Sequence, residues 1–442
     1  MTATRSGRDE DRREAARRFL QANGMDSGAL DAEREVETFL SEMDRGLSGS
    51  PSSLRMIPTF IEVDRDVPRG KPVVAIDAGG TNLRAAVVEI RGDGRPTVTA
   101  FRREQMPGTA GEISSRDFFA TLAGCVRDLA SDLESIGFSF SYPVEMVPSK
   151  DGRIIGLSKE LRVRGAAGQL VGAGLRAALH DAGVHSPRNA VVLNDAVAVL
   201  LAGRTATYDR EASHVGFVLG TGTNCAYVES NARIRKRNDL KPGGAQVVNV
   251  ESGAYDKVPR GPADLRYDKV SAEPGQYIFE KCISGAYLGG LALEVLRSAA
   301  DAGLFGDATA GVIRAAGRLE TRELDPFLGG EPAAGSLHQA IRTVGGAADA
   351  AMACDLVDGT VERAARLAAI SMAAAIRKAA VTHGGSGPVY VTVDGATFHG
   401  LRTFRERVTS CVDALLRDRV RHEIVTVEHA ALVGAAVAAL TN

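Results

Sequence analysis

The sequence predicts an α/β protein built from two similar halves. A short phrase, Gly-Thr-Asn, occurs at 80–82 and again at 222–224, and each copy lies between two runs rich in β-branched residues. Each copy is therefore typical of a strand, a glycine turn and a second strand. Strand-like runs alternate with helix-like segments along the rest of the chain, which indicates α/β layers. Because a glycine turn exposes N–H groups and admits a phosphate closely, we expect a duplicated fold that grips one polyphosphate from both sides.

The composition fits an ordinary soluble globular protein. The chain has 442 residues, of which 44% are hydrophobic and 24% charged, and this length suggests two or more domains. The net charge of −2 points neither to nucleic acid nor to an anionic membrane as a partner. No apolar run reaches the roughly 18 residues of a membrane span, and the polar N-terminus lacks a signal-peptide core. The five scattered cysteines show no CxxC spacing, so we expect reduced thiols in a cytoplasmic protein.

The first half of the chain is expected to begin with helices and to continue as alternating strands and helices. Residues 10–48 carry apolar positions at helical spacing, and Pro51 and Pro58 bracket a connector. Runs of β-branched and aromatic residues predict strands, and amphipathic or Ala-rich stretches predict helices. The expected elements are strands 73–77 and 83–90, helix 117–137, strand 138–142, helix 167–183, strand 190–194 and helix 195–204.

The second half is expected to repeat this alternation. It begins with a strand, glycine turn and strand over 215–229, and a boundary near 195–205 would leave one glycine turn in each half. The same criteria predict the elements that follow. They are helices 284–302 and 361–382, strand 389–394, helix 402–417, strand 423–427 and an Ala-rich helix 428–440.

The first glycine turn carries a carboxylate and a guanidinium. Asp77 comes at the end of a predicted strand, where its carboxylate could hold Mg²⁺ directly or through water. Arg84 could clamp a phosphoryl group during transfer. The structural alternative is a plain hairpin turn with an exposed Asp and Arg.

A second polar pair, Asn194-Asp195, follows a buried strand and opens a helix. Ligands of α/β sheets bind at such strand ends, and the helix N-terminus favours the charged carboxylate. The structural alternative is a helix N-cap, a position that both residue types favour.

Three weaker motifs complete the set. Asn249 and Glu251 together suit a ligand rich in hydroxyl groups, although a polar loop is the favoured explanation when the pair is seen alone. Ser158-Lys159 carries almost no information by itself. Asp394 is followed by glycine after a strand, which is also typical of a β-turn. Separately these motifs favour structural roles, whereas their order along the chain points to a function.

The ordered motifs resemble those of the hexokinase/glucokinase family, within the sugar kinase–actin–Hsp70 superfamily. The resemblance runs from about residue 36 to residue 440 and is that of a bacterial-type single-unit homologue. Ten motifs occur in family order. They lie at 42–47, 56–60, 77–84, 138–143, 158–159, 194–195, 220–224, 249–254, 283–289 and 393–395.

The resemblance implies a fold and a reaction. The fold would have two actin-like (ribonuclease H-like) domains with a cleft between them. Residues 1–72 would form N-terminal helices and a connector, 73–195 the small domain, completed by 428–442, and 196–427 the large domain. The reaction would transfer the γ-phosphoryl group of ATP to the 6-hydroxyl of a hexose with Mg²⁺ present. The protein would be a monomer or homodimer without nucleic-acid or membrane partners.

The resemblance also implies roles for individual residues. Asp195 would be the general base, with Lys159 and Arg84 as further catalytic groups, and Asp77 would approach the metal through water. The sugar would contact Ser141, Pro143, Ser158, Lys159, Asn194, Asp195, Asn224, Asn249 and Glu251. The nucleotide would contact Asp77, Gly79, Gly80, Thr81, Asn82, Gly220, Thr221, Gly222, Asp394, Gly395 and Ala396.

One departure from the family pattern bears on the substrate. The family has a Glu directly after the Tyr-Leu-Gly segment, where it contacts hydroxyls near C1 and C2 of the sugar, and this chain has Gly290 there. Loss of a charge-assisted hydrogen bond would cost about 1.5–3 kcal/mol. We therefore expect altered selectivity at C1 or C2. Smaller departures occur at 160–161, Ser252, Ala396 and 425–434.

Two other functions stay open from the sequence. The first is a kinase for a sugar modified at C1 or C2, or for a cyclitol. The second is a sugar- or nucleotide-sensing regulator without catalysis. Asp195, Lys159 and Arg84 together argue against a regulator, because binding alone does not need a general base beside a phosphoryl clamp.

Overall fold

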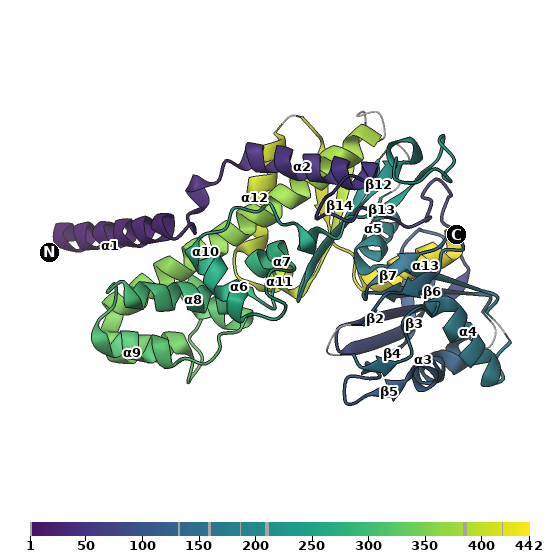
Figure 1. Ribbon diagram of the computed structural model, residues 1–442, viewed down its shortest axis with the longest axis horizontal. Coiled ribbons are helices and arrows are strands. Elements are labelled where there is room, and N and C mark those ends of the chain that lie inside the picture. Colours follow the sequence, from purple (N-terminus) through teal and green to yellow (C-terminus); the bar gives the residue numbers. More distant parts are fainter. Residues whose placement is uncertain are drawn as a thin grey trace.

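The chain folds around two β-sheets that carry helices on their faces (Figure 1). The structure is a computed structural model. It describes residues 2–130, 133–157, 161–185, 187–207, 212–382, 387–417 and 419–442.

Two sheets organise the molecule, and two short strand pairs lie beside them. The six-stranded sheet has the order β1 (Ile57–Pro58), β13 (Ala245–Asn249), β12 (Thr223–Ser230), β11 (Ser213–Leu219), β14 (Val389–Asp394) and β15 (His422–Val425). The five-stranded sheet has the order β10 (Asn189–Leu193), β6 (Ser135–Phe140), β2 (Pro72–Gly79), β3 (Asn82–Ile90) and β4 (Pro96–Gln105). The short pairs are β5 (Ile113–Ser114) with β9 (Val163–Arg164) and β7 (Val144–Met146) with β8 (Gly152–Ile154).

Both sheets repeat one topology. In the first, β4, β3 and β2 are antiparallel neighbours, and β6 and β10 continue the sheet in parallel with β2. In the second, β13, β12 and β11 are antiparallel, and β14 and β15 continue in parallel with β11. A glycine turn joins the equivalent hairpin strands in each sheet, β2–β3 and β11–β12. The duplication and the α/β class predicted from the sequence are therefore confirmed.

The helices are numbered in chain order. They are α1 (Thr2–Ala22), α2 (Ala32–Ser48), α3 (Ser115–Ala130), α4 (Val171–Asp181), α5 (Asp195–Ala206), α6 (Pro262–Val270), α7 (Ile278–Ile283), α8 (Leu288–Asp301), α9 (Asp307–Ala315), α10 (Leu337–Thr382), α11 (Ala396–Gly400), α12 (Phe404–Leu416) and α13 (Ala430–Thr441). Short 3₁₀ turns occur at Ser27–Ala29, Asn231–Arg233, Ser252–Ala254 and Thr321–Leu328. Within the described part of the chain, none of these helices has the length and apolar character needed to cross a membrane.

Helices α5 and α13 connect the two sheets. Helix α13 packs on the five-stranded sheet, α5 packs on β11 and β14 of the other sheet, and the two helices pack on each other. Both are almost entirely buried, which their Ala- and Val-rich sequences permit. They approach so closely that a Cβ atom at Gly434 would lie 1.7 Å from the Ala198 carbonyl oxygen. The domain limits drawn from the sequence stay a prediction.

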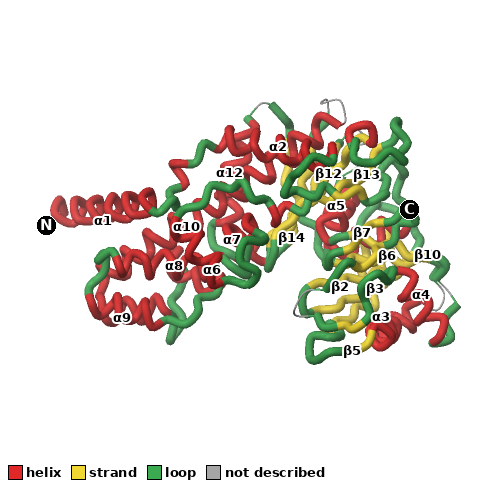
Figure 2. Tube along the Cα trace, viewed as in Figure 1, coloured by secondary structure: helices red, strands yellow, loops and turns green. Residues whose placement is uncertain are grey.

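The end of the molecule that contains α6–α10 is mostly helical, whereas the strands gather toward the other end (Figure 2). Helix α10 passes through this helical end and packs against α2, α8, α9 and α12. Its backbone leaves helical geometry at Gly346, where φ is 69°. Helix α1 packs on α10, and its N-terminal end projects beyond the rest of the protein (Figure 1).

The sequence misplaced or missed several elements. The helix expected over 117–137 ends at Ala130, and 135–137 belong to β6, which extends to Phe140. β6 lies between β2 and β10, and its central position in the sheet overrides the helical pattern. Strand β4 was not expected, because an exposed edge strand with a polar end lacks the apolar alternation that marks a half-buried strand.

Candidate active site

A chain of side-chain hydrogen bonds joins four of the residues predicted to bind sugar. The Asn224 amide donates to the Asn194 Oδ1 at 3.1 Å and to the Asn249 Oδ1 at 2.8 Å. The Asn249 amide in turn donates to the Glu251 Oε1 at 2.7 Å. Asn194 caps α5, Asn224 lies on β12, and Asn249 ends β13. Three elements thus bring these polar groups to one place, which we call the amide chain.

The amide chain lines a pocket to which both sheets contribute. Asn194, Asn249 and Glu251 form one wall. Tyr142 and Pro143, which follow β6 of the five-stranded sheet, belong to the same lining. The full lining is Arg55, Ile57, Thr59, Tyr142, Pro143, Val144, Met146, Asn194, Asn249 and Glu251. A compact pocket with a few convergent polar groups suits a small hydroxylated ligand.

Asp195 is the first residue of α5 and lies beside the amide chain. Its Oδ1 accepts a hydrogen bond from the Ala196 N–H at 2.8 Å. Burial raises the pKa of Asp195 to about 6, the negative charges of Asp77 and Glu251 add to this, and hydrogen bonds from Ala196 and the Ser141 hydroxyl oppose it. A carboxylate with a pKa just below neutrality is suited to accept a proton from an alcohol.

The first glycine turn holds a buried carboxylate. Asp77 and Arg84 are paired across the β2–β3 hairpin, and the Arg84 Nη1 lies 3.4 Å from the Asp77 Oδ2. Burial raises the pKa of Asp77, an effect that Arg84 opposes and the charge of Asp394 enhances. Asp77 is only 8% exposed. The exposed Asp that the structural alternative assumed is therefore wrong.

The turn itself is exposed, and it approaches the sugar-side residues through its backbone. Gly80 has φ of 57°, in the left-handed region that favours glycine. The Tyr142 hydroxyl donates to its carbonyl oxygen at 2.7 Å, and a Cβ atom at Gly79 would lie 3.1 Å from the Ser141 Oγ. Thr81 and Asn82 complete the turn, and Asn82 accepts from Arg103 of β4.

The second glycine turn meets the segment that follows β14. The Gly220 carbonyl accepts from the Gly285 N–H and from the Thr397 hydroxyl, each at 2.8 Å. Gly395 has φ of 127°, and a Cβ atom there would lie 2.3 Å from the Leu219 carbonyl oxygen. Gly220 of the second turn therefore lies beside Gly395 and Ala396, as expected if both segments contact one nucleotide.

Sequence reasoning missed Glu280, a partly buried carboxylate near the amide chain. Its Oε2 accepts from the Thr223 N–H at 2.9 Å. Burial raises the pKa of Glu280 to about 7, and the charges of Glu251 and Asp195 add to the shift. The available signal was a lone acid within the otherwise apolar start of α7, Ile278–Ile283. A carboxylate that is partly withdrawn from water needs a specific partner, and the Thr223 N–H is that partner here.

The structure corrects the prediction made for Gly290. This residue lies on α8, and a Cβ atom there would lie 2.5 Å from the Tyr267 hydroxyl oxygen. The position faces α6 and does not line the pocket of the amide chain. The expected loss of a sugar-site carboxylate is therefore wrong at this position, and the C1- or C2-modified substrate loses its support. The predicted residues Ser158 and Lys159 lie outside the described residues.

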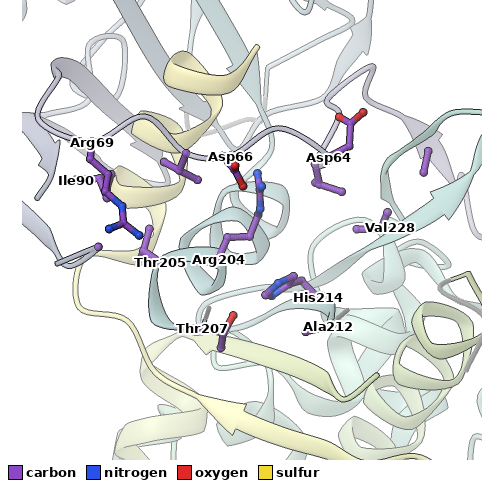
Figure 3. Close-up of a pocket in the computed structure, with 14 residues that line it drawn as sticks. Asp64, Asp66, Arg69, Ile90, Arg204, Thr205, Thr207, Ala212, His214 and Val228 are labelled. Atoms are coloured by element: carbon purple, nitrogen blue, oxygen red, sulfur yellow. The ribbon is translucent and has the colours of Figure 1, made fainter. Parts of the chain in front are cut away.

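A larger cavity lies at the opposite end of α5 (Figure 3). It is lined by Asp64, Asp66 and Arg69 of the connector, and the Arg204 side chain points toward Asp66. Arg204 lies about 14 Å from Asp195 along the helix axis. None of the predicted site residues that the structure describes lines this cavity.

The side chains present fit a magnesium ion held mainly by nucleotide phosphates and water. Within the described ranges, no group of three or more His, Cys, Asp or Glu side chains could hold a metal. Mg²⁺ typically takes one or two carboxylates and keeps several waters. Asp77 is a buried strand-end carboxylate beside the first glycine turn, so it meets that requirement.

The fold and the site together define a two-domain α/β phosphotransferase. Two hexokinase family models match the chain, one over residues 214–441 and the other over residues 16–205. The chain therefore belongs to the hexokinase family.

Individual relatives are similar along most of their length. Hexokinase-5 of Oryza sativa subsp. japonica is 30% identical over 436 residues, which cover 88% of this chain and 82% of the relative. Hexokinase-1 of Schizosaccharomyces pombe is 28% identical over 437 residues, 91% of this chain and 86% of the relative. A solved hexokinase from Schistosoma mansoni in complex with glucose has a TM-score of 0.79 at 25% identity, covering 98% of this chain and 99% of that chain.

Proposed function

We propose that this protein is an ATP-dependent hexose kinase in which Asp195 takes the proton from the sugar 6-hydroxyl. The observation that carries the proposal is the position of Asp195. It follows Asn194 of the amide chain, and the negative charges of Asp77 and Glu251 both act on its carboxylate. One carboxylate is thus close both to a polar pocket and to the strand that leads into the first glycine turn.

The amide chain would hold the sugar hydroxyls together with Glu280. Asn and Gln amides donate and accept in one plane, and carboxylates accept, so the set can satisfy several hydroxyl groups in a fixed orientation. In the structure these groups bond to one another. A bound hexose would replace some of these bonds with bonds to its own hydroxyls. Ser141 and Pro143 would border the sugar from the five-stranded sheet, and Ser158 and Lys159 are proposed to do so as well.

Asp195 would act by accepting the proton as the 6-hydroxyl oxygen attacks the γ-phosphorus. With its pKa near 6, the carboxylate is mostly ionised at neutral pH, so it is ready to accept a proton. The attacking oxygen must also be held in line with the leaving group, because phosphoryl transfer depends on positioning and electrostatic stabilisation. The amide chain would provide that positioning.

The two glycine turns would hold ATP between them. Their backbone N–H groups would face the phosphates, and 394–396 would lie beside the adenosine. The Arg84 guanidinium would stabilise the charge of the transferred group, with Lys159 as a further cation. Bound Mg²⁺ would neutralise phosphate charge, and Asp77 would hold it, directly or through water.

Sugar-dependent ADP release tests the proposal directly. A panel of hexoses, beginning with glucose because the Schistosoma mansoni relative was solved with it, should show ADP release that requires the sugar. Asp195→Ala should abolish turnover, while calorimetry should still detect sugar binding. Sugar binding without ADP release in the unmodified protein would contradict the kinase and favour a regulator. Near-normal turnover in Asp195→Ala would contradict the role of Asp195.

A further inference from the structure

A largely buried ionic network fixes α7, the short helix that bears Glu280. It consists of Asp264 and Asp268 of α6, Lys281 of α7 and Arg363 of α10, and we call it the α6–α7 network. Three of these side chains are at most 5% exposed, and Asp268 is partly exposed. No motif in the sequence pointed to these residues. Buried charges of this kind are costly unless they are paired, so their geometry is closely fixed.

Arg363 ties α6 to the long helix α10. This residue is 1% exposed. Its Nη1 donates to the Asp264 Oδ1 at 3.1 Å and its Nη2 to the Asp264 Oδ2 at 2.9 Å, a bidentate pair. The Nη2 also donates to the Pro259 carbonyl at 2.7 Å, and Asp264 accepts from the Gly261 N–H at 2.8 Å. Bidentate pairing fixes direction as well as distance, so α10 sets the position of the start of α6.

Two contacts fix α7 relative to α6. The Lys281 ammonium donates to the Asp268 Oδ1 at 2.6 Å and to the Glu273 carbonyl at 2.9 Å. The Cys282 thiol lies 3.6 Å from the Asp264 Oδ1. Glu280 directly precedes these two residues. The backbone that bears Glu280 is therefore held by the same carboxylates that bind Arg363 and Lys281.

Neighbouring backbone leaves the Glu280 carboxylate little room to move. A Cβ atom at Gly222 would lie 2.6 Å from its Oε2, and one at Gly253 would lie 3.2 Å from the same atom. On the buried side of α7, the Phe279 ring packs 5.9 Å from that of Tyr255. A small shift of α7 would therefore break the bond from Thr223 to Glu280 or press the carboxylate against Gly222.

We propose that Arg363 is a positioning residue for sugar binding, which it supports by holding α6 and α7 so that Glu280 faces the pocket. Among the described residues, no hydrogen bond or ion pair joins Arg363 to Glu280, so the effect of Arg363 passes through Asp264 and α7. The inference rests on the proposed function, because it takes Glu280 to be a sugar ligand.

A double-mutant cycle with Arg363→Met and Glu280→Gln tests this dependence in the full chain. Glu280→Gln should raise the sugar KM about tenfold or more, and Arg363→Met should raise it about tenfold, while each leaves the ATP KM within about twofold. In the Glu280→Gln background, Arg363→Met should raise the sugar KM by less than about twofold. Thermal unfolding should report a similar loss of stability from Arg363→Met in both backgrounds.

Two further variants keep the test decisive. Lys378→Met is the matched control, because Lys378 is also a buried α10 cation with an ion pair, to Asp44 of α2. It should lower the melting temperature and leave the sugar KM within about twofold. Arg363→Lys keeps the charge without the bidentate geometry, so its sugar KM should lie between those of the unmodified protein and Arg363→Met. It replaces Arg363→Met in the cycle if the Arg363→Met protein does not fold.

The outcomes separate the inference from the proposed function. A tenfold effect of Arg363→Met in both backgrounds, or no effect in either, would overturn the positioning role and leave the proposed function intact. An unchanged sugar KM in Glu280→Gln would instead overturn Glu280 as a sugar ligand, and the inference with it.

Discussion

The two Gly-Thr-Asn turns have the same residues and the same place in their sheets, but their asparagines differ in environment. Asn82 is partly exposed and accepts a hydrogen bond from Arg103. Asn224 is 9% exposed and donates to both Asn194 and Asn249. The carboxylates differ as well, since Asp77 precedes the first turn within its own strand, whereas Glu280 reaches the second from a separate helix.

This difference shows how a duplicated fold can divide two tasks between its copies. The two turns differ in backbone shape, since Gly80 has φ of 57° and neither glycine of the second turn has a positive φ, but glycine lets a phosphate approach the backbone of each turn. The asparagine that follows each turn then forms hydrogen bonds with groups on the neighbouring strand of its sheet. In the first copy that neighbour is the edge strand β4, and in the second it is β13, which ends in Asn249. We therefore assign the first turn to the phosphoryl group and the second to the sugar as well as the phosphates.

The largest effect is expected at Asp195, between the two turns. Asp195→Asn should lower kcat by about 10²- to 10⁴-fold, because the proton of the 6-hydroxyl would lose its acceptor. Steady-state ADP release gives kcat, and calorimetry should show that sugar binding persists. A decrease of less than about fivefold in kcat would contradict the role of Asp195.

Arg84 tests the phosphoryl side of the comparison. Arg84→Met should lower kcat about 10²-fold with little change in the sugar KM, since a charge on the transferred group would lose its partner. Arg103→Met is a matched control, because Arg103 is the cross-strand neighbour of Arg84 on β4. Equal effects of the two substitutions on kcat would argue against a phosphoryl clamp at Arg84.

Adding a methyl group to each turn should separate the two tasks further. In Gly222→Ala the new Cβ would meet the Glu280 carboxylate, so the sugar KM should rise about tenfold. Gly80→Ala meets no atom within 4 Å but must adopt φ of 57°. It should cost roughly 1 kcal/mol of stability and leave the sugar KM nearly unchanged. Sugar and ATP KM values, with thermal unfolding, measure both effects, and a larger sugar KM for Gly80→Ala would reverse the assignment.

The smallest expected effect is on stability and depends on pH. The pKa of Asp195 is raised to about 6 from its usual value near 4, so the native state binds its proton more tightly than the unfolded state. The stability that this protonation contributes is present at low pH and is lost as the pH rises through about 6. Asp195→Asn, which does not titrate, should therefore unfold less readily than the original protein above about pH 7, by about 1–2 kcal/mol. Urea unfolding at about pH 4.5 and about pH 7.5 checks this. A difference in unfolding free energy between the two proteins that narrows with rising pH would contradict it.

Local signals made much of the fold predictable. Runs of β-branched residues around a glycine turn define each hairpin within about 15 residues, so both hairpins were expected where they occur. The N-cap at Asn194 and the strand before it are equally local. The sheet order was not accessible in this way, because β11 pairs with β14 across a large part of the chain.

The site was predictable as a set of residues but not as a network. Asn224 meets Asn249 from 25 positions away and Asn194 from 30 positions away, and no local pattern encodes those contacts. Glu280 was missed because its short helix is identified only by its packing. Gly290 was misinterpreted for the same reason, since α7 and α8 follow each other closely. Only the structure shows that Glu280 of α7 lies near Glu251 and Asp195, whereas Gly290 of α8 lies against Tyr267.

Sugar binding to Asn82→Ala and Asn224→Ala, measured by calorimetry without nucleotide, tests the division of labour most directly. Thermal melting should first confirm that each variant is folded. We predict that Asn224→Ala weakens sugar binding about tenfold to a hundredfold, because the amide chain is broken at its centre, and that Asn82→Ala changes it by less than about twofold. Equal weakening in the two variants, or a larger effect at Asn82, would contradict the assignment of the second turn to the sugar.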